Sequence, residues 1–298
     1  MAAPEKTRLL NILLADDGSA DARAAVDLLA SLPHVAESRI TAIRVFSALQ
    51  TAEYKAIEDG LERTKHLLMS RHLHVKTELL MGYPSDKIIE YAEDTQPDLI
   101  VMGAKGQRAT LGIPLGGVAM HIVEDGRWPV LVVRKEHSKL ERILLAVDGS
   151  ECSDIACNFL GNFPLPQGAQ VHVMHVMSEI YPEVLIEPFA GGVGVMPAAI
   201  TAEDLKRHQE QQKIHAERLL QNVIRSLSVQ GVQAEAVLRR GDAATEIINY
   251  ATNNNIDLIV AGSRGLGAVR SWLMGSVSRK LVHYSECSVL IARCAKPG

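Results

Sequence analysis

The stretch that decides the fold reads Ile256-Asp257-Leu258-Ile259-Val260-Ala261-Gly262-Ser263-Arg264-Gly265, then nine residues, then Gly275-Ser276. Its apolar, β-branched first part predicts a buried strand, its glycines predict a loop, and a helix is expected to begin at Gly275-Ser276. Glycine lets the backbone approach an anion without a Cβ in the way, and a helix N-terminus offers unpaired N–H groups. The segment therefore predicts a phosphate-binding loop, with Ser276 adding a hydroxyl donor; an ordinary strand-to-helix turn is the alternative.

The same pattern occurs once more, in the first half of the chain. Residues 97–102 lead into Gly103-Ala104-Lys105-Gly106, and Gly116-Gly117 follow after nine residues. The two loops lie 159 positions apart (262 − 103), whereas Asp17-Gly18-Ser19 and Asp148-Gly149-Ser150 lie 131 apart (148 − 17). The chain is thus a tandem duplication whose second copy carries 28 additional residues (159 − 131). A repeat of this size is a whole domain, and we expect domains at 1–137 and 138–298.

Length and composition agree with two α/β domains. The chain has 298 residues, of which 47 % are hydrophobic and only 4 % aromatic, so the cores should consist of Ala, Val, Leu and Ile. Such cores favour parallel strands covered by helices. The net charge of −4 argues against general nucleic-acid binding. No apolar run reaches the roughly 18 residues of a membrane span, and the N-terminus lacks an apolar signal core, so we expect a cytoplasmic protein with no membrane partner.

Cysteine usage predicts no disulfide framework. The four cysteines, Cys152, Cys157, Cys287 and Cys294, all lie in the second copy, and none forms a CxxC pair. A duplicated disulfide or zinc site would normally occur in both copies. We therefore expect four reduced, mostly buried thiols.

Strands alternate with helices in both halves, which predicts βαβ units and mostly parallel sheets. Strands are expected at 10–15, 40–45, 74–80, 99–102 and 129–133, and again at 142–147, 170–176, 233–238, 258–261 and 288–292. The linker at 135–141 is short and charged, so the domains should form a fixed pair. The 28 additional residues fall around 181–199, a Gly- and Pro-rich stretch that predicts either a surface loop or a flap over a site. A capping box at Thr201-Ala202-Glu203-Asp204 then predicts a long polar helix to about residue 226.

Charged residues occur where the predicted strands end. Asp17 and Asp148 follow the first strand of each copy, at the edge where α/β sheets bind ligands. Either carboxylate could bond a ribose hydroxyl or hold a magnesium ion; the alternative is a helix N-cap. Lys105 and Arg264 lie inside the glycine loops, where they could neutralise phosphate or remain solvated cations.

Several catalytic signatures are absent from the sequence. There is no G-x-x-x-x-G-K-[ST] loop, which excludes a P-loop NTPase, and no G-x-S-x-G elbow. No Ser/His/Asp set is shared by the two copies. His208 and His215 lie seven apart on one predicted helix, too far for a tight metal pair. The pattern indicates ligand binding without an efficient catalytic apparatus.

Gly262-x2-Gly265-x9-Gly275-Ser276, with Asp148 after the first strand, resembles the ATP-binding pattern of the universal stress protein family. The resemblance covers nearly the whole chain as two tandem copies. It implies two Rossmann-like domains, each a five-stranded parallel sheet of order 3-2-1-4-5 flanked by helices. The terminal strands, within 128–134 and 287–293, would pair antiparallel between domains as an intramolecular pseudo-dimer, and a homodimer stays open.

The resemblance also implies ATP and magnesium as ligands. In the second copy, Asp148 would contact ribose or metal and the Val176 backbone would read adenine. Ribose and phosphates would be held by Gly262, Arg264, Gly265, Gly275, Ser276 and Val277. The corresponding residues of the first copy are Asp17, Val45, Gly103, Lys105, Gly106, Gly116, Gly117 and Val118. Gly117 departs from the family pattern, which has Ser or Thr there, so the first site should lack one hydrogen bond, worth about 1.5–3 kcal/mol.

The leading functional hypothesis is an ATP-binding, nucleotide-dependent regulator of the stress response. A slow ATPase that converts ATP to ADP or AMP is the second hypothesis, since binding groups are present without a positioned general base. A non-nucleotide interaction module is the third, and the intact second motif argues against it. ATP-pyrophosphatase relatives are excluded, because they need a Ser-Gly-Gly loop where this chain has Asp-Gly-Ser.

Overall fold

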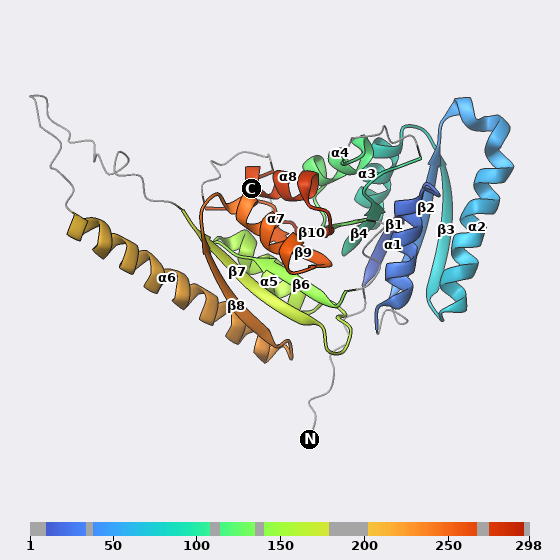
Figure 1. Ribbon diagram of the computed structural model, residues 1–298. Coiled ribbons are helices and arrows are strands. Elements are labelled where there is room, and N and C mark those ends of the chain that lie inside the picture. The colour runs from blue at the N-terminus through green and yellow to red at the C-terminus, as the bar shows by residue number, and fades with distance from the viewer. Residues whose placement is uncertain are drawn as a thin grey trace, which may run out of the picture.

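The computed structural model describes residues 10–33, 38–107, 114–134, 140–178, 202–266 and 274–294. Strands and helices alternate along both halves (Figure 1). The elements of the first half are β1 (Asn11–Ala15), α1 (Ala20–Ser31), β2 (Arg39–Phe46), η2 (Ala48–Glu53), α2 (Tyr54–Ser70), β3 (His74–Met81), α3 (Pro84–Thr95), β4 (Leu99–Gly103), α4 (Gly117–Asp125) and β5 (Val130–Val133). Those of the second half are β6 (Arg142–Ala146), α5 (Glu151–Gly161), β7 (Gln170–Met177), α6 (Ala202–Val229), β8 (Ala234–Arg240), α7 (Ala243–Asn253), β9 (Leu258–Gly262), α8 (Ser276–Tyr284) and β10 (Ser288–Ala292).

All ten strands belong to one sheet that runs through both halves, in the order β3-β2-β1-β4-β5-β10-β9-β6-β7-β8. Every pairing within a half is parallel, which confirms the parallel α/β class. The halves meet where β5 pairs antiparallel with β10, through Val132↔Val289, Leu131↔Leu290 and Val130↔Ile291. The two outermost strands, β3 and β8, belong to different halves.

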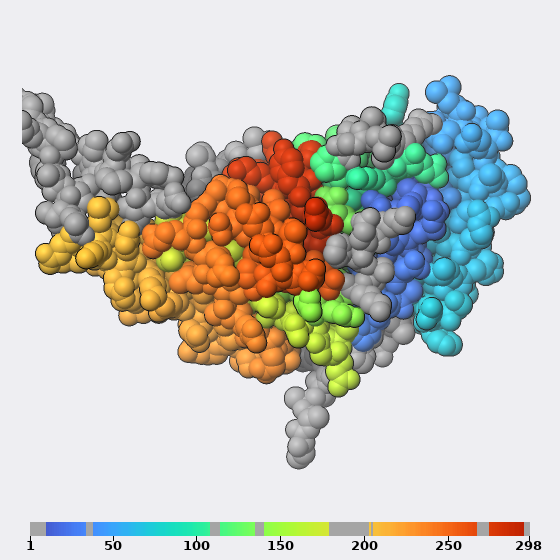
Figure 2. Space-filling view, in the orientation of Figure 1, coloured from blue at the N-terminus to red at the C-terminus, as the bar shows by residue number. Residues whose placement is uncertain are grey.

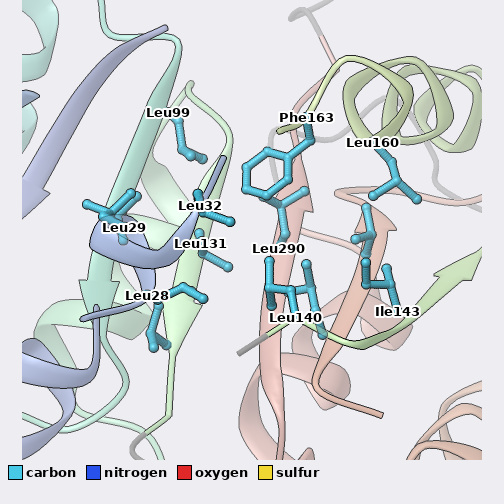
Figure 3. Packing of buried hydrophobic residues seen from close by; sticks show 14 of the residues in the cluster. Leu28, Leu29, Leu32, Leu99, Leu131, Leu140, Ile143, Leu160, Phe163 and Leu290 are labelled. Carbon is cyan, nitrogen blue, oxygen red and sulfur yellow. The ribbon is translucent and has the colours of Figure 1, made fainter. Parts of the chain in front are cut away.

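Helices cover both faces of this sheet, so successive residues of a strand are buried on opposite sides. In β1, Ile12 and Leu14 pack under α1 and α2, whereas Leu13 packs under α3 and α4. The second half repeats the arrangement with α5 and α6 on one face and α7 and α8 on the other. Figure 3 shows the first of these clusters, with Leu131 of β5 and Leu290 of β10 both in it. One apolar layer therefore continues across the junction between halves.

Two arginines reinforce the junction in equivalent positions, because Arg134 and Arg293 are 159 residues apart (293 − 134). Arg134 Nη2 donates to Val282 O of α8 over 2.8 Å, and Arg293 Nη2 donates to Val123 O of α4. Val123 and Val282 are themselves 159 apart (282 − 123). Each arginine thus satisfies a carbonyl near the C-terminal end of a helix in the other half, where orphan carbonyls and the helix dipole favour a cation.

The expectation of four reduced thiols is wrong for two of them. Cys152 and Cys294 form a disulfide, with Cα atoms 5.2 Å apart, because the end of β10 lies beside the N-terminus of α5. Cys157 and Cys287 are free and buried. Burial raises the pKa of the Cys287 thiol to about 12, so it is protonated at neutral pH.

Three expectations concern residues outside the described part of the chain: most of the linker at 135–141, the insertion around 181–199, and Thr201 of the capping box. The long polar helix is present as α6, whose N-terminal part extends away from the sheet in Figure 1. In the first half a 3₁₀ helix, η2, leads directly into α2. No helix in the described ranges has both the length and the apolar character of a membrane span.

Candidate functional site

The glycine loops lie at the carboxyl ends of the strands, and a backbone hydrogen bond closes each loop onto its own start. Gly116 N donates to Ala104 O over 2.8 Å, and Gly275 N donates to Ser263 O over 2.8 Å. Helices α4 and α8 begin at the next residue in each case. Neither N-cap glycine offers a side chain to the first N–H groups of its helix, so these donors face the loop where an anion could accept from them.

Asp148 and Asp17, which follow the first strand of each half, accept hydrogen bonds from the glycine loops. Asp148 Oδ2 accepts from Leu266 N over 3.0 Å, while Oδ1 accepts from the backbone and hydroxyl of Ser150 at 3.0 and 2.6 Å. Asp17 accepts from Gln107 N and from Ser19 N, both at 2.9 Å. The N-caps of α1 and α5 are Ser19 and Ser150, so the N-cap alternative for the two aspartates is wrong. Each aspartate fixes the distance between the first strand and the glycine loop.

The glycines have two different structural roles. A Cβ on Gly262 would lie 2.6 Å from the backbone of Cys152, and one on Gly103 would lie 2.6 Å from Ala22 N, so both allow a helix to pack on the strand end. A Cβ on Gly106 would lie 2.7 Å from Asp17 Oδ2, and a Cβ on Gly265 would clash with Asp148 Oδ2. These two let the loop close over the carboxylate.

Each half has a cavity at this place, and the predicted residues divide between the two. The cavity of the first half, about 270 Å³, is lined by all eight residues predicted for that copy: Asp17, Val45, Gly103, Lys105, Gly106, Gly116, Gly117 and Val118. The cavity of the second half, about 1120 Å³, is lined by all eight of its counterparts: Asp148, Val176, Gly262, Arg264, Gly265, Gly275, Ser276 and Val277. Their contact with a nucleotide stays a prediction.

Val45 and Val176 occupy the same position relative to the sheet. Pairing between β6 and β7 ends at Met174, and pairing between β1 and β2 ends at Ile43, in each case two residues earlier. The backbone edge of each valine that faces β1 or β6 therefore has no strand partner and lies next to the cavity. This geometry suits a backbone that exchanges hydrogen bonds with a planar base.

The cavities differ in residues that the sequence analysis missed. Met102 and Pro84 line the first cavity where Ala261 and Ala243 line the second. The first cavity thus has larger side chains at two positions where the second has alanine. Their positions in the sequence were a usable signal, since all four residues lie at the carboxyl end of a predicted strand or just after it, where α/β sheets bind ligands.

Two cations extend the second cavity along α8, and both were also missed. Arg279 and Lys280 line it, whereas the equivalent residues of α4 are Met120 and His121. Arg279 Nε lies 3.0 Å from Glu124 Oε1 of the first half, and Lys280 Nζ lies 3.6 Å from Asp242 Oδ2. Asp242 also accepts from the Thr245 hydroxyl and backbone, which together with Lys280 hold its pKa below the usual value.

A third cation, Arg293, is half-buried and lies near Glu124 and Asp125. Burial lowers the pKa of Arg293 to about 10; Arg264 adds to the decrease, and Asp125 and Glu124 oppose it. Arg293 remains protonated at neutral pH. From α6, Gln211, Gln212 and His215 line the cavity as well. Within the described residues no group of three or more His, Cys, Asp or Glu side chains could hold a metal ion by itself.

The profile of the Universal stress protein family matches the chain twice, at residues 9–134 and 139–293. The chain belongs to the universal stress protein family. The two matches correspond to the two halves of the sheet.

Relatives include single-domain members that align with about half of this chain. Universal stress protein YxiE of Bacillus subtilis is 32 % identical over 152 residues, which cover 51 % of this chain and 98 % of that protein. A universal stress protein of Thermus aquaticus is 36 % identical over 153 residues, covering 51 % and 97 %. Among solved structures, a universal stress protein from Archaeoglobus fulgidus has a TM-score of 0.61 at 18 % identity and covers 95 % of this chain and 96 % of its own. This likeness concerns the fold of both halves together.

Proposed function

We propose that this universal stress protein binds ATP with magnesium, chiefly in the second domain, and acts as a nucleotide-dependent regulator of the stress response. The observation that carries the proposal is the second cavity. It combines a strand-end glycine loop, the N-terminus of α8, the Ser276 position and the Arg264 position in one space of about 1120 Å³. A nucleotide requires these groups together: a roomy apolar end for the base and an electropositive, glycine-lined end for phosphates.

The proposed roles follow from the geometry of the cavity. The Val176 backbone reads adenine beside Ile247 and Ala261, which line the apolar end. The N–H groups at the start of α8 and the Ser276 hydroxyl donate to phosphate, and Arg264 neutralises its charge. Asp148 holds the loop through Leu266 N and offers its remaining lone pairs to ribose or metal.

Magnesium fits the site only as an ion shared with the nucleotide. Asp148 provides a single carboxylate, and no other carboxylate is found among the described residues that line the second cavity. Magnesium keeps several waters and is commonly bound by one or two carboxylates together with substrate phosphates. The ion would supply charge neutralisation between phosphate oxygens, and Asp148 would anchor it from the protein side. Asp17 would have the same role in the first domain.

The first domain is proposed to bind ATP more weakly. Gly117 supplies no hydroxyl, and the cavity of about 270 Å³ is smaller. Its backbone framework, with the loop bond from Gly116 to Ala104 and the Asp17 contact to Gln107, is the same as in the second domain. The difference therefore lies in affinity and not in the type of ligand.

Two measurements test the proposal. The purified protein is denatured and any released nucleotide is identified, and titration calorimetry with ATP and magnesium then measures binding to nucleotide-free protein. Gly275→Val brings a branched side chain to the phosphate end of the loop, and its Cβ already lies 3.3 Å from Arg264 Cα, so we expect binding in the second domain to be lost. Gly117→Ala is the matched control, because its Cβ meets no atom within 4 Å.

An incubation with labelled ATP distinguishes regulation from turnover. Prolonged incubation with labelled ATP should leave the nucleotide largely intact, and accumulation of ADP or AMP would favour the slow ATPase. If the Gly275→Val variant has an unchanged circular dichroism spectrum and binds ATP as tightly as the wild type, the proposed site is wrong.

A further inference from the structure

One side chain of the second cavity also reaches the first domain. Arg279 lies in the first turn of α8 and lines the second cavity, and its Nε lies 3.0 Å from Oε1 of Glu124. Glu124 belongs to α4, the helix whose first residues line the first cavity. In Figures 1 and 2, α8 and α4 lie next to each other where the halves meet. Arg279 therefore connects the second site to the helix that begins at the first.

The ion pair between these residues can be exchanged for another partner. The side chains of Arg279 and Glu124 are 46 % and 26 % exposed. Although Glu124 Oε1 is buried, the structure shows no hydrogen bond to it, so the attraction to Arg279 is electrostatic without an aligned N–H. Pairs of this kind contribute little to stability. A guanidinium binds phosphate oxygens through two aligned N–H groups, and such contacts are stronger.

The rest of the junction does not depend on this pair. Arg134 and Arg293 hold the last turns of α8 and α4 through carbonyl oxygens, and neither arginine lines a cavity. The two helices can therefore stay docked while Arg279 changes its partner.

The duplication makes this arrangement one-sided. The residues equivalent to Arg279 and Glu124 are Met120 and His283 (279 − 159 and 124 + 159). A methionine cannot bind phosphate through charge or pair with an acid. Among the described residues, the second site therefore has a cation shared with the other domain, and the equivalent position of the first site does not.

We propose that Arg279 is a positioning residue shared between Glu124 and the polyphosphate of a nucleotide in the second cavity, so that binding there releases Glu124 and loosens the end of α4. This inference rests on the proposed function. The released carboxylate stands near the C-terminal end of α4, beside Asp125, where the helix dipole disfavours a negative charge. Phosphate binding in the second domain is thereby communicated to the helix that begins at the first site.

The test compares ATP with adenosine by titration calorimetry on the full chain. Glu124→Gln removes the competitor for Arg279, so we expect ATP with magnesium to bind about two- to fivefold more tightly and adenosine to bind unchanged. Arg279→Gln should weaken ATP binding and leave adenosine binding unchanged. Asp125→Asn is the matched control, since this neighbouring carboxylate on α4 lies 3.6 Å from His121 Nε2 of the same helix, and it should leave the ATP affinity at the wild-type value.

Hydrogen exchange supplies the second readout. ATP should accelerate exchange in the last turn of α4, adenosine should not, and the acceleration should be absent in Arg279→Gln. ATP binding that is equally tight in wild type and Glu124→Gln, or a Glu124→Gln effect of the same size for adenosine, overturns the inference and leaves the proposed function intact. A wild-type protein that binds neither ligand overturns both.

Discussion

Adding one methyl group at Gly265 should weaken nucleotide binding in the second domain without unfolding it. The Cβ of Gly265→Ala would clash with Asp148 Oδ2, the atom that accepts from Leu266 N. Asp148 cannot simply turn away, because Ser150 holds its other oxygen with two hydrogen bonds. The loop must therefore shift, and the Leu266 bond is the contact that breaks.

The size of the effect follows from that bond. A hydrogen bond to a charged group contributes about 1.5–3 kcal/mol, and 1.4 kcal/mol corresponds to about tenfold in affinity. The bond between Leu266 and Asp148 is exposed, so the lower end applies. We expect ATP with magnesium to bind about tenfold more weakly, since the loop must return to its closed position before phosphate is held.

Titration calorimetry on Gly265→Ala, with Gly117→Ala as the tolerated control, measures this effect. Gly106→Ala is the counterpart in the first domain, where the new Cβ would lie 2.7 Å from Asp17 Oδ2, and it should weaken the first site while sparing the second. Wild-type ATP affinity in a folded Gly265→Ala protein would refute the reasoning, because the loop would then not need the Asp148 contact.

Three further predictions concern the two cavities and the junction. Met102→Ala should enlarge the first cavity and raise its ATP affinity, and calorimetry should then show a second binding event that is weak or absent in the wild type. Gly117→Ser should tighten the first site by up to about tenfold through a new hydroxyl donor, since a Cβ at Gly117 meets no atom within 4 Å. Val289→Pro should lower the melting temperature, because β10 pairs on both sides and a proline in an interior strand removes a ladder hydrogen bond.

Each of these has an outcome that contradicts it. An unchanged first-site affinity in a folded Met102→Ala protein would mean that cavity size does not limit binding there. If Gly117→Ser does not raise the ATP affinity of the first site, the missing hydroxyl does not limit binding there. For the junction, hydrogen exchange in the unmutated protein should show β5 and β10 as protected strands, and rapid exchange in both would contradict their pairing.

The fold was predictable from the sequence because its strands are buried on both faces. Runs such as Leu258–Gly262 are apolar throughout, which is typical of parallel strands between two layers of helices. The glycine loops were equally visible, since the spacing of Gly262, Gly265 and Gly275 repeats in the first half. What the loop spacing could not provide was the role of each glycine, which depends on atoms supplied by other elements.

The contacts that sequence reasoning missed join residues far apart in the chain. Arg279 and Glu124 are 155 residues apart (279 − 124), and Cys152 and Cys294 are 142 apart. Both contacts depend on how layers pack around the sheet. Helix periodicity locates Arg279 on α8 but carries no information about the helix of the other domain beside it. The reduced-thiol expectation failed for the same reason, because only the sheet order brings the end of β10 next to α5.

The duplication makes each half a control for the other, and the comparison separates scaffold from specificity. Three contacts with the backbone are retained in both halves. They are the hydrogen bond that closes the glycine loop, the aspartate that accepts from the loop, and the arginine that donates to a carbonyl of the other half. Residues at or next to the cavities have changed, with Met102, Gly117 and Met120 where the second half has Ala261, Ser276 and Arg279. Under the proposed function, all three differences would favour phosphate binding in the second site. If occupancy of the second site acts on α4 as proposed, the retained bonds that keep α4 docked against α8 would give the first domain a structural use even where its own site binds weakly.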